Sequence, residues 1–130
     1  MMLFIRTGID LIEIERIQRA IQRHGKRFLE RVYTPGELAV CGQDAVCLAG
    51  RFAAKEAVSK ALGTGIGPVV WREMEILCGP AGEPVLRLHG KAQVIAAALK
   101  LTAWSVSISD THTQAAAVAV ALGDSTPLGN

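Results

Sequence analysis

A glutamate and a lysine stand four residues apart in the middle of the chain, directly before a run of alternating glycines. Glu56 and Lys60 belong to the segment RFAAKEAVSKALGTGIG, which occupies residues 51–67. On a helix, a spacing of four residues places the carboxylate and the ammonium on one face. The glycines at positions 63, 65 and 67 would let the backbone approach a bulky ligand closely. The segment therefore indicates a site that holds a metal-bound phosphate ester.

The ordinary alternative for Glu56 and Lys60 is a solvent-exposed helix pair, which contributes only about 0.3–0.5 kcal/mol to stability. The glycine run favours the ligand-binding interpretation. It does not form a Walker loop, because such a loop precedes its helix and directs the helix N-terminus at phosphate, whereas these glycines follow the predicted helix. A phosphate bound here would have to be held by Lys60, by amides of the loop and by a cation.

A second carboxylate, Asp10, ends a short apolar run that contains Gly8. Taken alone, Asp10 is explained as the N-cap of a helix, because aspartate is among the best residues at that position. Capping and metal binding are compatible. Magnesium usually takes one or two protein carboxylates and leaves its other positions to water and substrate phosphates. We expect Asp10 and Glu56 to be these two carboxylates, brought together from separate elements.

The chain has 130 residues, half of them hydrophobic, which is enough for one domain with a sizeable core. We assign that domain to residues 1–122 and expect a loose tail at residues 123–130, which are rich in turn-forming residues. The net charge of +2 gives no general reason to expect nucleic-acid binding. No apolar run approaches the roughly 20 residues that a membrane-spanning helix needs. We therefore expect neither a nucleic-acid nor a membrane partner.

The three cysteines, Cys41, Cys47 and Cys78, form neither a C-x-x-C motif nor a cysteine–histidine pair at zinc spacing. An odd number at these spacings does not support a disulfide framework. Apolar residues surround them, which predicts buried free thiols. These features are typical of a protein of the reducing cytoplasm.

The apolar run at residues 2–9 predicts a strand that gives way to a helix at Asp10. A helix over residues 11–28 would bury an apolar stripe on one side. Its opposite side would carry four arginines, Arg16, Arg19, Arg23 and Arg27. Such a stripe is usually a solvated helix face. In a chain with almost no net charge, it would steer an acidic protein partner better than a small metabolite.

The remainder of the chain predicts helices and strands in an order typical of an α+β fold. A capping box that begins at Thr34 starts a short helix, and a longer helix over residues 44–62 ends at Gly63. After the glycine loop we expect strands at 69–78 and 84–89 joined in a hairpin, a helix at 91–100, and strands at 103–109 and 115–122. The predicted fold is α+β, with helices packed on an antiparallel sheet.

The chain resembles the holo-acyl-carrier-protein synthases, the small 4′-phosphopantetheinyl transferases, in GIDLIEIERI at residues 8–17 and in the segment at residues 51–67. The resemblance covers residues 4–122. It also includes FLERVYTPGE at residues 28–37, the GEPVL turn at residues 82–86 and VSIS at residues 106–109. Several ordered motifs at the right separations are far more specific than any one of them.

The resemblance implies transfer of the phosphopantetheine arm from coenzyme A to a serine of acyl carrier protein, as a step of fatty acid biosynthesis. Magnesium is the implied cofactor, and adenosine 3′,5′-bisphosphate is the implied second product. The family is typically a homotrimer whose active sites are shared between neighbouring subunits. A homotrimer located in the cytoplasm is therefore expected.

Roles of individual residues also follow from the resemblance. Asp10 and Glu56 match the metal ligands, and the positions that match the surroundings of coenzyme A are Arg51, Ser59, Lys60, Gly63 and Pro84. The helix that meets the acidic carrier protein is matched by Arg16, Arg19 and Arg23. The residues expected to act in catalysis are Glu56, Lys60 and Asp110.

The chain departs from many relatives after its VSIS segment, where they carry a histidine and it carries Asp110, with His112 two residues further on. We expect Glu56 to accept the serine proton through a water, with Asp110 as the second candidate. Two other functions stay open. A non-catalytic module that binds coenzyme A or a nucleotide would use the glycine loop without transfer, but it would have little need of Asp10. A protein that acts only by interaction would use the arginine stripe.

Overall fold

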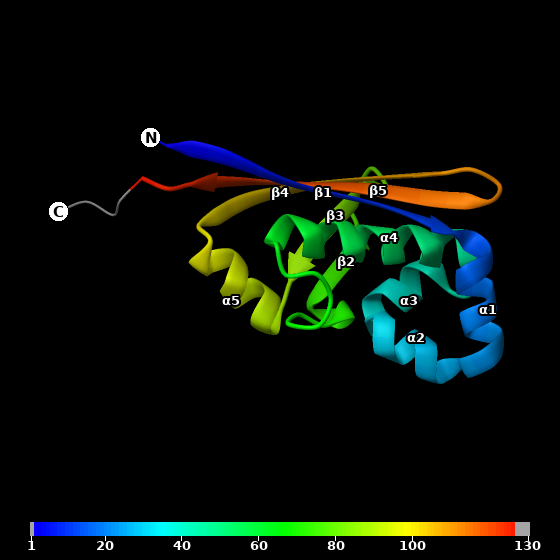
Figure 1. The fold of residues 1–130 in the computed structure, drawn as a ribbon. Coiled ribbons are helices and arrows are strands. Elements are labelled where there is room, and N and C mark those ends of the chain that lie inside the picture. The colour runs from blue at the N-terminus through cyan, green and yellow to red at the C-terminus, as the bar shows by residue number, and fades with distance from the viewer. Residues whose placement is uncertain (1, 127–130) are drawn as a thin grey trace.

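Helices cover one face of a three-stranded sheet in the computed structural model, which describes residues 2–126 (Figure 1). In chain order the elements are β1 (Leu3–Glu13), α1 (Ile14–His24), α2 (Lys26–Val32), α3 (Pro35–Cys41), α4 (Ala45–Leu62), the 3₁₀-helix η1 (Trp71–Glu73), β2 (Met74–Cys78), β3 (Pro84–Leu88), α5 (Gly90–Ala98), β4 (Leu101–Asp110) and β5 (Gln114–Asp124). All strand pairs are antiparallel. The predicted α+β class is confirmed.

The larger sheet has β5 in the middle, with β1 and β4 on its two sides. Every second residue of β5 faces the helix layer, and these residues are the buried alanines Ala115, Ala117, Ala119 and Ala121. Alanine side chains are short, so a helix can pack close to the sheet at these positions. The helix that does so is α4, which contacts both β1 and β5.

Helix α4 approaches the sheet very closely at Gly8 in β1. A Cβ atom added to Gly8 would lie 1.8 Å from the carbonyl oxygen of Ala57 and 2.9 Å from the amide nitrogen of Ala61. No side chain fits at these distances, so this crossing requires glycine. Because residues two apart in a strand face the same side, Asp10 also points toward the helix layer.

Strand β1 is longer than the sequence predicts. Asp10 is still extended and pairs with Ala117 of β5, and the strand continues to Glu13. Helix α1 begins only at Ile14, and the side chain of Glu13 makes no capping hydrogen bond. The expected change from strand to helix at Asp10, and its role as an N-cap, are therefore wrong. Pairing with a strand more than 100 residues later holds this segment extended.

The helix expected over residues 11–28 is in fact two helices. Gly25 separates α1 from α2 and has a φ of 53°, a left-handed conformation that interrupts the helix. The predicted apolar stripe is present, because Ile14 and Ile17 are buried and Phe28 packs against the core. The arginine stripe therefore bends at Gly25 instead of following one straight axis.

Thr34 starts α3 as predicted. Its hydroxyl accepts a hydrogen bond from the amide of Glu37 at 3.1 Å, and the Glu37 carboxylate accepts one from the amide of Thr34 at 2.9 Å. These two bonds are the capping box. Glu37 is fully buried, so its carboxylate needs further partners inside the protein.

The main partner of Glu37 is Lys55 of α4, which is also fully buried, with its ammonium 2.7 Å from Glu37 Oε1. The ammonium also donates to the carbonyls of Trp71 at 3.0 Å and Met74 at 2.8 Å, so all three of its hydrogens are used. Glu37 Oε2 accepts from the amide of Ile76 at 2.8 Å. Burial lowers the pKa of Lys55, and the Glu37 carboxylate opposes that change. The pair joins α3, α4, η1 and β2.

The second half of the chain follows the prediction closely. Helix α4 is capped by Asp44 and ends at Gly63, which has a φ of 82°. Strands β2 and β3 form the expected antiparallel hairpin, although β2 starts at Met74 because residues 71–73 form the 3₁₀-helix. Strand β4 alternates as predicted, with Val106 buried and the serines beside it exposed.

The cysteines differ from the prediction. Cys41 and Cys47 form a disulfide with a Cα–Cα distance of 5.4 Å, which links the end of α3 to the first turn of α4. Cys78 is a free thiol, but it is exposed at the end of β2. The expectation of three buried free thiols is therefore wrong. The tight reversal of the chain between α3 and α4 brings Cys41 and Cys47 together, and no spacing rule reveals that reversal.

The C-terminal boundary is also later than expected. Strand β5 continues through Asp124, and the amide of Ser125 donates to the carbonyl of Met2 at 2.9 Å. A loose tail that starts at residue 123 is therefore wrong for Gly123 and Asp124. Residues 127–130 of the predicted tail lie outside the described residues.

The helices leave the other face of the large sheet uncovered (Figure 1). The side chains of Leu3, Ile5, Ile9 and Leu11 in β1 are all more than half exposed there. Among the helices of residues 2–126, none combines the length and apolar character needed to cross a membrane.

Candidate active site

Three of the predicted site residues meet where α4 crosses β1. The Lys60 ammonium lies 3.2 Å from Asp10 Oδ1 and donates to the carbonyl of Ile9 at 2.8 Å. Glu56 lies one turn before Lys60 on the same helix, as the sequence predicts. Residues separated by about 50 positions in the sequence are thus neighbours, and the Gly8 crossing is the reason.

Glu56 has a perturbed carboxyl group. Burial raises its pKa, and the negative charge of Asp10 raises it further, while Lys60 and Arg16 act in the opposite direction. Asp10 contacts Lys60, which is one helical turn from Glu56, so both carboxylates lie at the same crossing of α4 and β1. Two acids that converge in this way are a feature of functional sites, because such an arrangement costs stability.

The donor set fits a magnesium ion. Asp10 and Glu56 supply carboxylate oxygens from two different elements, and Asp10 remains partly exposed, at 19% of its side-chain surface. Two carboxylates leave room for water and for phosphate oxygens around a metal that prefers oxygen ligands. No group of three or more acidic, histidine or cysteine side chains suited to a metal occurs in residues 2–126. A metal ion bound by these two carboxylates would therefore need water molecules or substrate phosphate oxygens to complete its coordination.

The backbone of the glycine loop is already engaged. The amide of Gly63 donates to the carbonyl of Lys60, and the amides of Thr64 and Gly65 both donate to the carbonyl of Ser59. The amide of Gly67 donates to the carbonyl of Val69. The amides of Gly63, Thr64 and Gly65 thus close the end of α4, and the amide of Gly67 bonds within the loop, so the free chain does not offer these four amides to a phosphate as expected. Side chains must hold any anion at this place.

Ser59 and Gly63 lie at the base of this loop. The Ser59 side chain is fully buried, and its hydroxyl donates to the carbonyl of Glu56 at 2.7 Å. Its own carbonyl accepts the amides of Thr64 and Gly65. The geometry thus gives Ser59 a part in the shape of the loop, whereas Lys60 presents a charge beside it.

Arg51 and Pro84 are both neighbours of Cys78, at the turn end of the β2–β3 hairpin. Arg51 Nη2 lies 3.2 Å from the thiol of Cys78, and Cys78 pairs with Pro84 between β2 and β3. The Arg51 Nε atom is buried without a hydrogen-bond partner among the described residues. Arg51 precedes Glu56 by five residues on α4, so this cationic group lies along the same helix.

Asp110 lies on the other outer strand of the sheet. It ends β4, whereas Asp10 is in β1, and β5 runs between them. Two strand spacings separate the outer strands by about 10 Å. Asp110 and His112 are both exposed near the β4–β5 turn. Within one chain, the structure does not bring Asp110 to Glu56.

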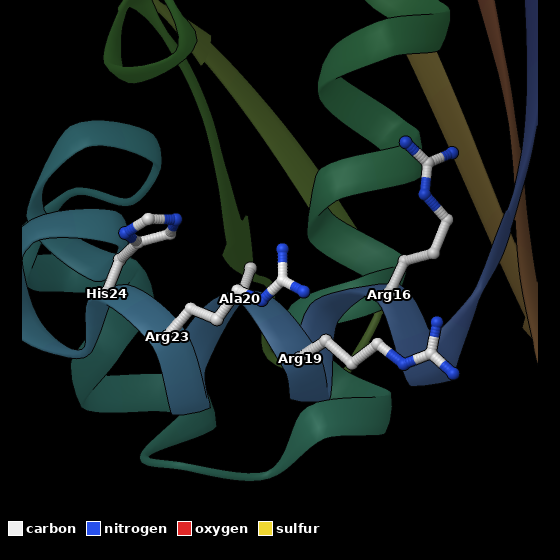
Figure 2. A pocket seen from close by; sticks show the side chains of 5 residues that line it. All are labelled: Arg16, Arg19, Ala20, Arg23 and His24. Carbon is white, nitrogen blue, oxygen red and sulfur yellow. The ribbon is translucent and has the colours of Figure 1, made fainter.

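The arginine stripe begins beside the acid pair. Figure 2 shows Arg16 reaching toward α4, while Arg19, Arg23 and His24 continue along α1. These side chains line a hollow of about 300 Å³ together with Ala20. Arg19 forms an exposed pair with Glu15 at 2.7 Å, and no carboxylate of the described residues pairs with Arg16 or Arg23. A basic surface therefore leads away from Glu56 along α1.

One basic residue beside the glycine loop is absent from the sequence-based assignment. Arg6 of β1 donates from Nε to the carbonyl of Ala61 at 2.6 Å, close to the end of α4. Strand alternation places residues 6, 8 and 10 on one face of β1. This alternation is a signal that could have placed Arg6 beside the site.

Two carboxylates with adjacent cations suit a metal-bound phosphate. The chain belongs to the 4′-phosphopantetheinyl transferase superfamily, whose family model matches residues 6–121. The resemblance to this class that the sequence motifs indicate is confirmed.

Similar proteins carry a more specific name. The holo-[acyl-carrier-protein] synthases of Herpetosiphon aurantiacus and Moorella thermoacetica are 48% and 46% identical to this chain, over 90% and 89% of its length and 98% and 92% of theirs. The crystal structure of the Helicobacter pylori holo-[acyl-carrier-protein] synthase in complex with coenzyme A has a TM-score of 0.82 and 34% identity, over 88% of this chain and 98% of that one. The prediction of an enzyme of this family is therefore confirmed.

The raised pKa of Glu56 predicts a stability effect. The folded state disfavours the ionised Glu56 carboxylate, so ionisation of Glu56 destabilises the fold at neutral pH. This destabilisation disappears as the pH falls below the ordinary glutamate pKa. Glu56→Gln is therefore expected to raise the melting temperature of the metal-free protein at pH 7, by a few degrees at most because the group is partly exposed. Near pH 4 the gain should shrink.

Thermal unfolding followed by circular dichroism checks this expectation, with Glu30→Gln on the exposed face of α2 as the matched control. A Glu56→Gln protein that melts below the wild type at both pH values would contradict it.

Proposed function

We propose that the protein transfers the 4′-phosphopantetheine group of coenzyme A to a serine hydroxyl of acyl carrier protein, with release of adenosine 3′,5′-bisphosphate. The observation that carries the proposal is the convergence of Asp10, Glu56 and Lys60 at the α4–β1 crossing, in a chain of this superfamily. Two carboxylates and an ammonium suit a metal-bound diphosphate. The similar synthases of Herpetosiphon and Moorella support acyl carrier protein as the acceptor, and the Helicobacter complex with coenzyme A supports coenzyme A as the donor.

Asp10 and Glu56 are the proposed magnesium ligands. Bound magnesium would neutralise negative charge on the diphosphate and so favour displacement at the phosphorus next to pantetheine. Lys60 adds a further positive charge at the same place. Because phosphoryl transfer needs little covalent chemistry from the protein, positioning and charge neutralisation by these three side chains account for most of the catalysis.

Glu56 is the proposed acceptor of the serine proton, through an intervening water. Its position one helical turn from Lys60, at the α4–β1 crossing, supports this role. Asp110 is the second candidate. It is distant from Glu56 within one chain, so it would act only at a site completed by a neighbouring subunit.

A non-catalytic module that binds coenzyme A is the alternative. The second carboxylate, Asp10, favours the transferase, since a binding module would have little need to place an acid where it repels Glu56. We place the reaction in fatty acid biosynthesis in the cytoplasm, where the Cys41–Cys47 disulfide would be open to reduction. Immunoblots of cell fractions test this location, and recovery of the protein outside the cytoplasmic fraction would contradict it.

A mass assay tests the transfer directly. The protein mixed with coenzyme A, magnesium and an apo carrier should add one phosphopantetheine arm to the carrier, and a chelator should stop the reaction. Glu56→Gln is expected to lower kcat by on the order of 100- to 1000-fold, since it removes both a ligand and the proposed base. Asp110→Asn should keep most of the activity.

A fully active Glu56→Gln would refute the role of Glu56. Binding of coenzyme A by the wild type without any change in carrier mass would favour the non-catalytic alternative.

The arginine stripe is the proposed docking surface for the acidic carrier protein. Arg16 is close enough to lower the pKa of Glu56, so a carrier that lies along α1 would bring its serine toward the acid pair. Arg19 and Arg23 extend the positive surface from there (Figure 2).

Arg23→Ala should raise the KM for the carrier several-fold and leave the KM for coenzyme A unchanged. Added salt should weaken carrier binding, because exposed charges are screened. Lys91→Ala on α5 is the control, and carrier binding that is insensitive to salt would exclude a role for the stripe.

A homotrimer is the proposed assembly. The uncovered apolar face of the large sheet supports it, because an exposed apolar patch of this kind usually marks an interface. Ile5→Lys should convert the trimer into monomers in sedimentation experiments, whereas Val94→Lys, which changes an equally exposed residue of α5, should not. A wild-type protein that sediments as a monomer would contradict the proposal.

A further inference from the structure

Arg6 lies at the C-terminal end of α4, beside the first glycine of the loop. Its Nε donates to the carbonyl of Ala61 at 2.6 Å, and a Cβ atom added to Gly63 would lie 2.6 Å from its Nη2. The residue opposite Arg6 on β5 is Ala121, whose short side chain leaves room for the guanidinium. The planar group is therefore held against the glycine loop.

The end of α4 is unfavourable for an anion unless side chains compensate. The C-terminus of a helix carries partial negative charge. The loop amides that could offset it are engaged, because those of Gly63, Thr64 and Gly65 all donate to carbonyls of the last helical turn. A phosphate near this loop must therefore be neutralised by cationic side chains.

Two cations border the loop, and they differ in what they already contact. Lys60 donates to Asp10 and to the carbonyl of Ile9. Arg6 uses only Nε, and within residues 2–126 no acceptor contacts its terminal nitrogens and no carboxylate pairs with it. Those nitrogens carry four N–H groups in a fork whose geometry matches two phosphate oxygens.

We propose that Arg6 binds a phosphate group of coenzyme A. This role rests on the proposed function, and it adds a residue from β1 to the cations of α4. The bond from Nε to Ala61 orients the guanidinium, and the terminal nitrogens then face the loop with their donors free. Gly63 leaves space for the guanidinium, since any side chain there would collide with it.

The competing explanation is structural. An arginine that only caps the carbonyls at the end of α4 would stabilise the helix and would not affect ligand binding. The two roles predict different measurements. A cap alone predicts a lower melting temperature for Arg6 variants with unchanged affinity of the folded protein, whereas phosphate binding predicts a loss of affinity.

Calorimetric titration of the purified full chain with coenzyme A, in the presence of magnesium, tests the proposal. Arg6→Gln should weaken binding roughly 10- to 100-fold, the usual effect of losing a hydrogen bond to a charged group. Arg6→Lys, which keeps the charge without the fork, should lose less. Arg72→Gln, an exposed arginine of η1, is the matched control and should bind as the wild type does.

A second titration with 3′-dephospho-coenzyme A identifies the phosphate. If Arg6 binds the 3′-phosphate, Arg6→Gln and the wild type should bind this analogue equally. If Arg6 binds the diphosphate, the variant should lose affinity for both compounds. Equal binding of coenzyme A by the wild type and by folded Arg6→Gln would overturn the proposal, and should that variant not fold, equal binding by Arg6→Lys would overturn it.

These results separate the role of Arg6 from the proposed function. A wild type that binds coenzyme A but leaves the carrier unmodified would refute the transfer and leave the Arg6 result standing. A wild type that modifies the carrier, with a variant of undiminished affinity, would refute only the role of Arg6.

Discussion

The close crossing of α4 over β1 is the constraint on which the rest of the structure depends. At Gly8 the backbone of the strand nearly touches the backbone of the helix. On the neighbouring strand β5, the short side chains of the buried alanines also let α4 pack close to the sheet. A side chain at Gly8 would lift α4 and separate Asp10 from Lys60. On either side of Gly8, Arg6 reaches the end of the helix and Asp10 reaches its charged face. The site is thus a consequence of backbone proximity.

The buried pair of Lys55 and Glu37 fixes α4 in a second direction. Lys55 immediately precedes Glu56, so the ammonium that ties the helix to α3, η1 and β2 also sets the rotation that presents Glu56 to Asp10. Burying two charges is costly, and it is tolerated here because every hydrogen of the ammonium has an acceptor. The Glu37 carboxylate is likewise satisfied by the amides of Thr34 and Ile76. Such a network specifies one position of the helix, whereas apolar contacts alone would allow sliding.

Local signals predicted the local structure well, and the remainder depended on distant contacts. Thr34 and Gly63 were correctly predicted as helix caps, because the residues that form a cap lie within a few positions of one another. Asp10 was assigned to the wrong element because its extended conformation comes from pairing with β5, about 100 residues later. The Cys41–Cys47 disulfide was not predicted, because it depends on the chain reversal between α3 and α4, which no local pattern reveals. The acid pair was nonetheless predicted, because recognition of the family motifs does not require knowledge of the intervening path.

The charges of the site are left partly unsatisfied in the free chain, and this imbalance favours ligand binding. Lys60 is half exposed, so its contact with Asp10 is worth at most about 1 kcal/mol and can be exchanged for a phosphate at little cost. Glu56 has no such partner within residues 2–126, and burial together with repulsion by Asp10 keeps its pKa raised. The repulsion lowers the stability of the fold, but it also increases the affinity of the two acids for positive charge. A site that bound its own charges fully would have less free energy to gain from a substrate.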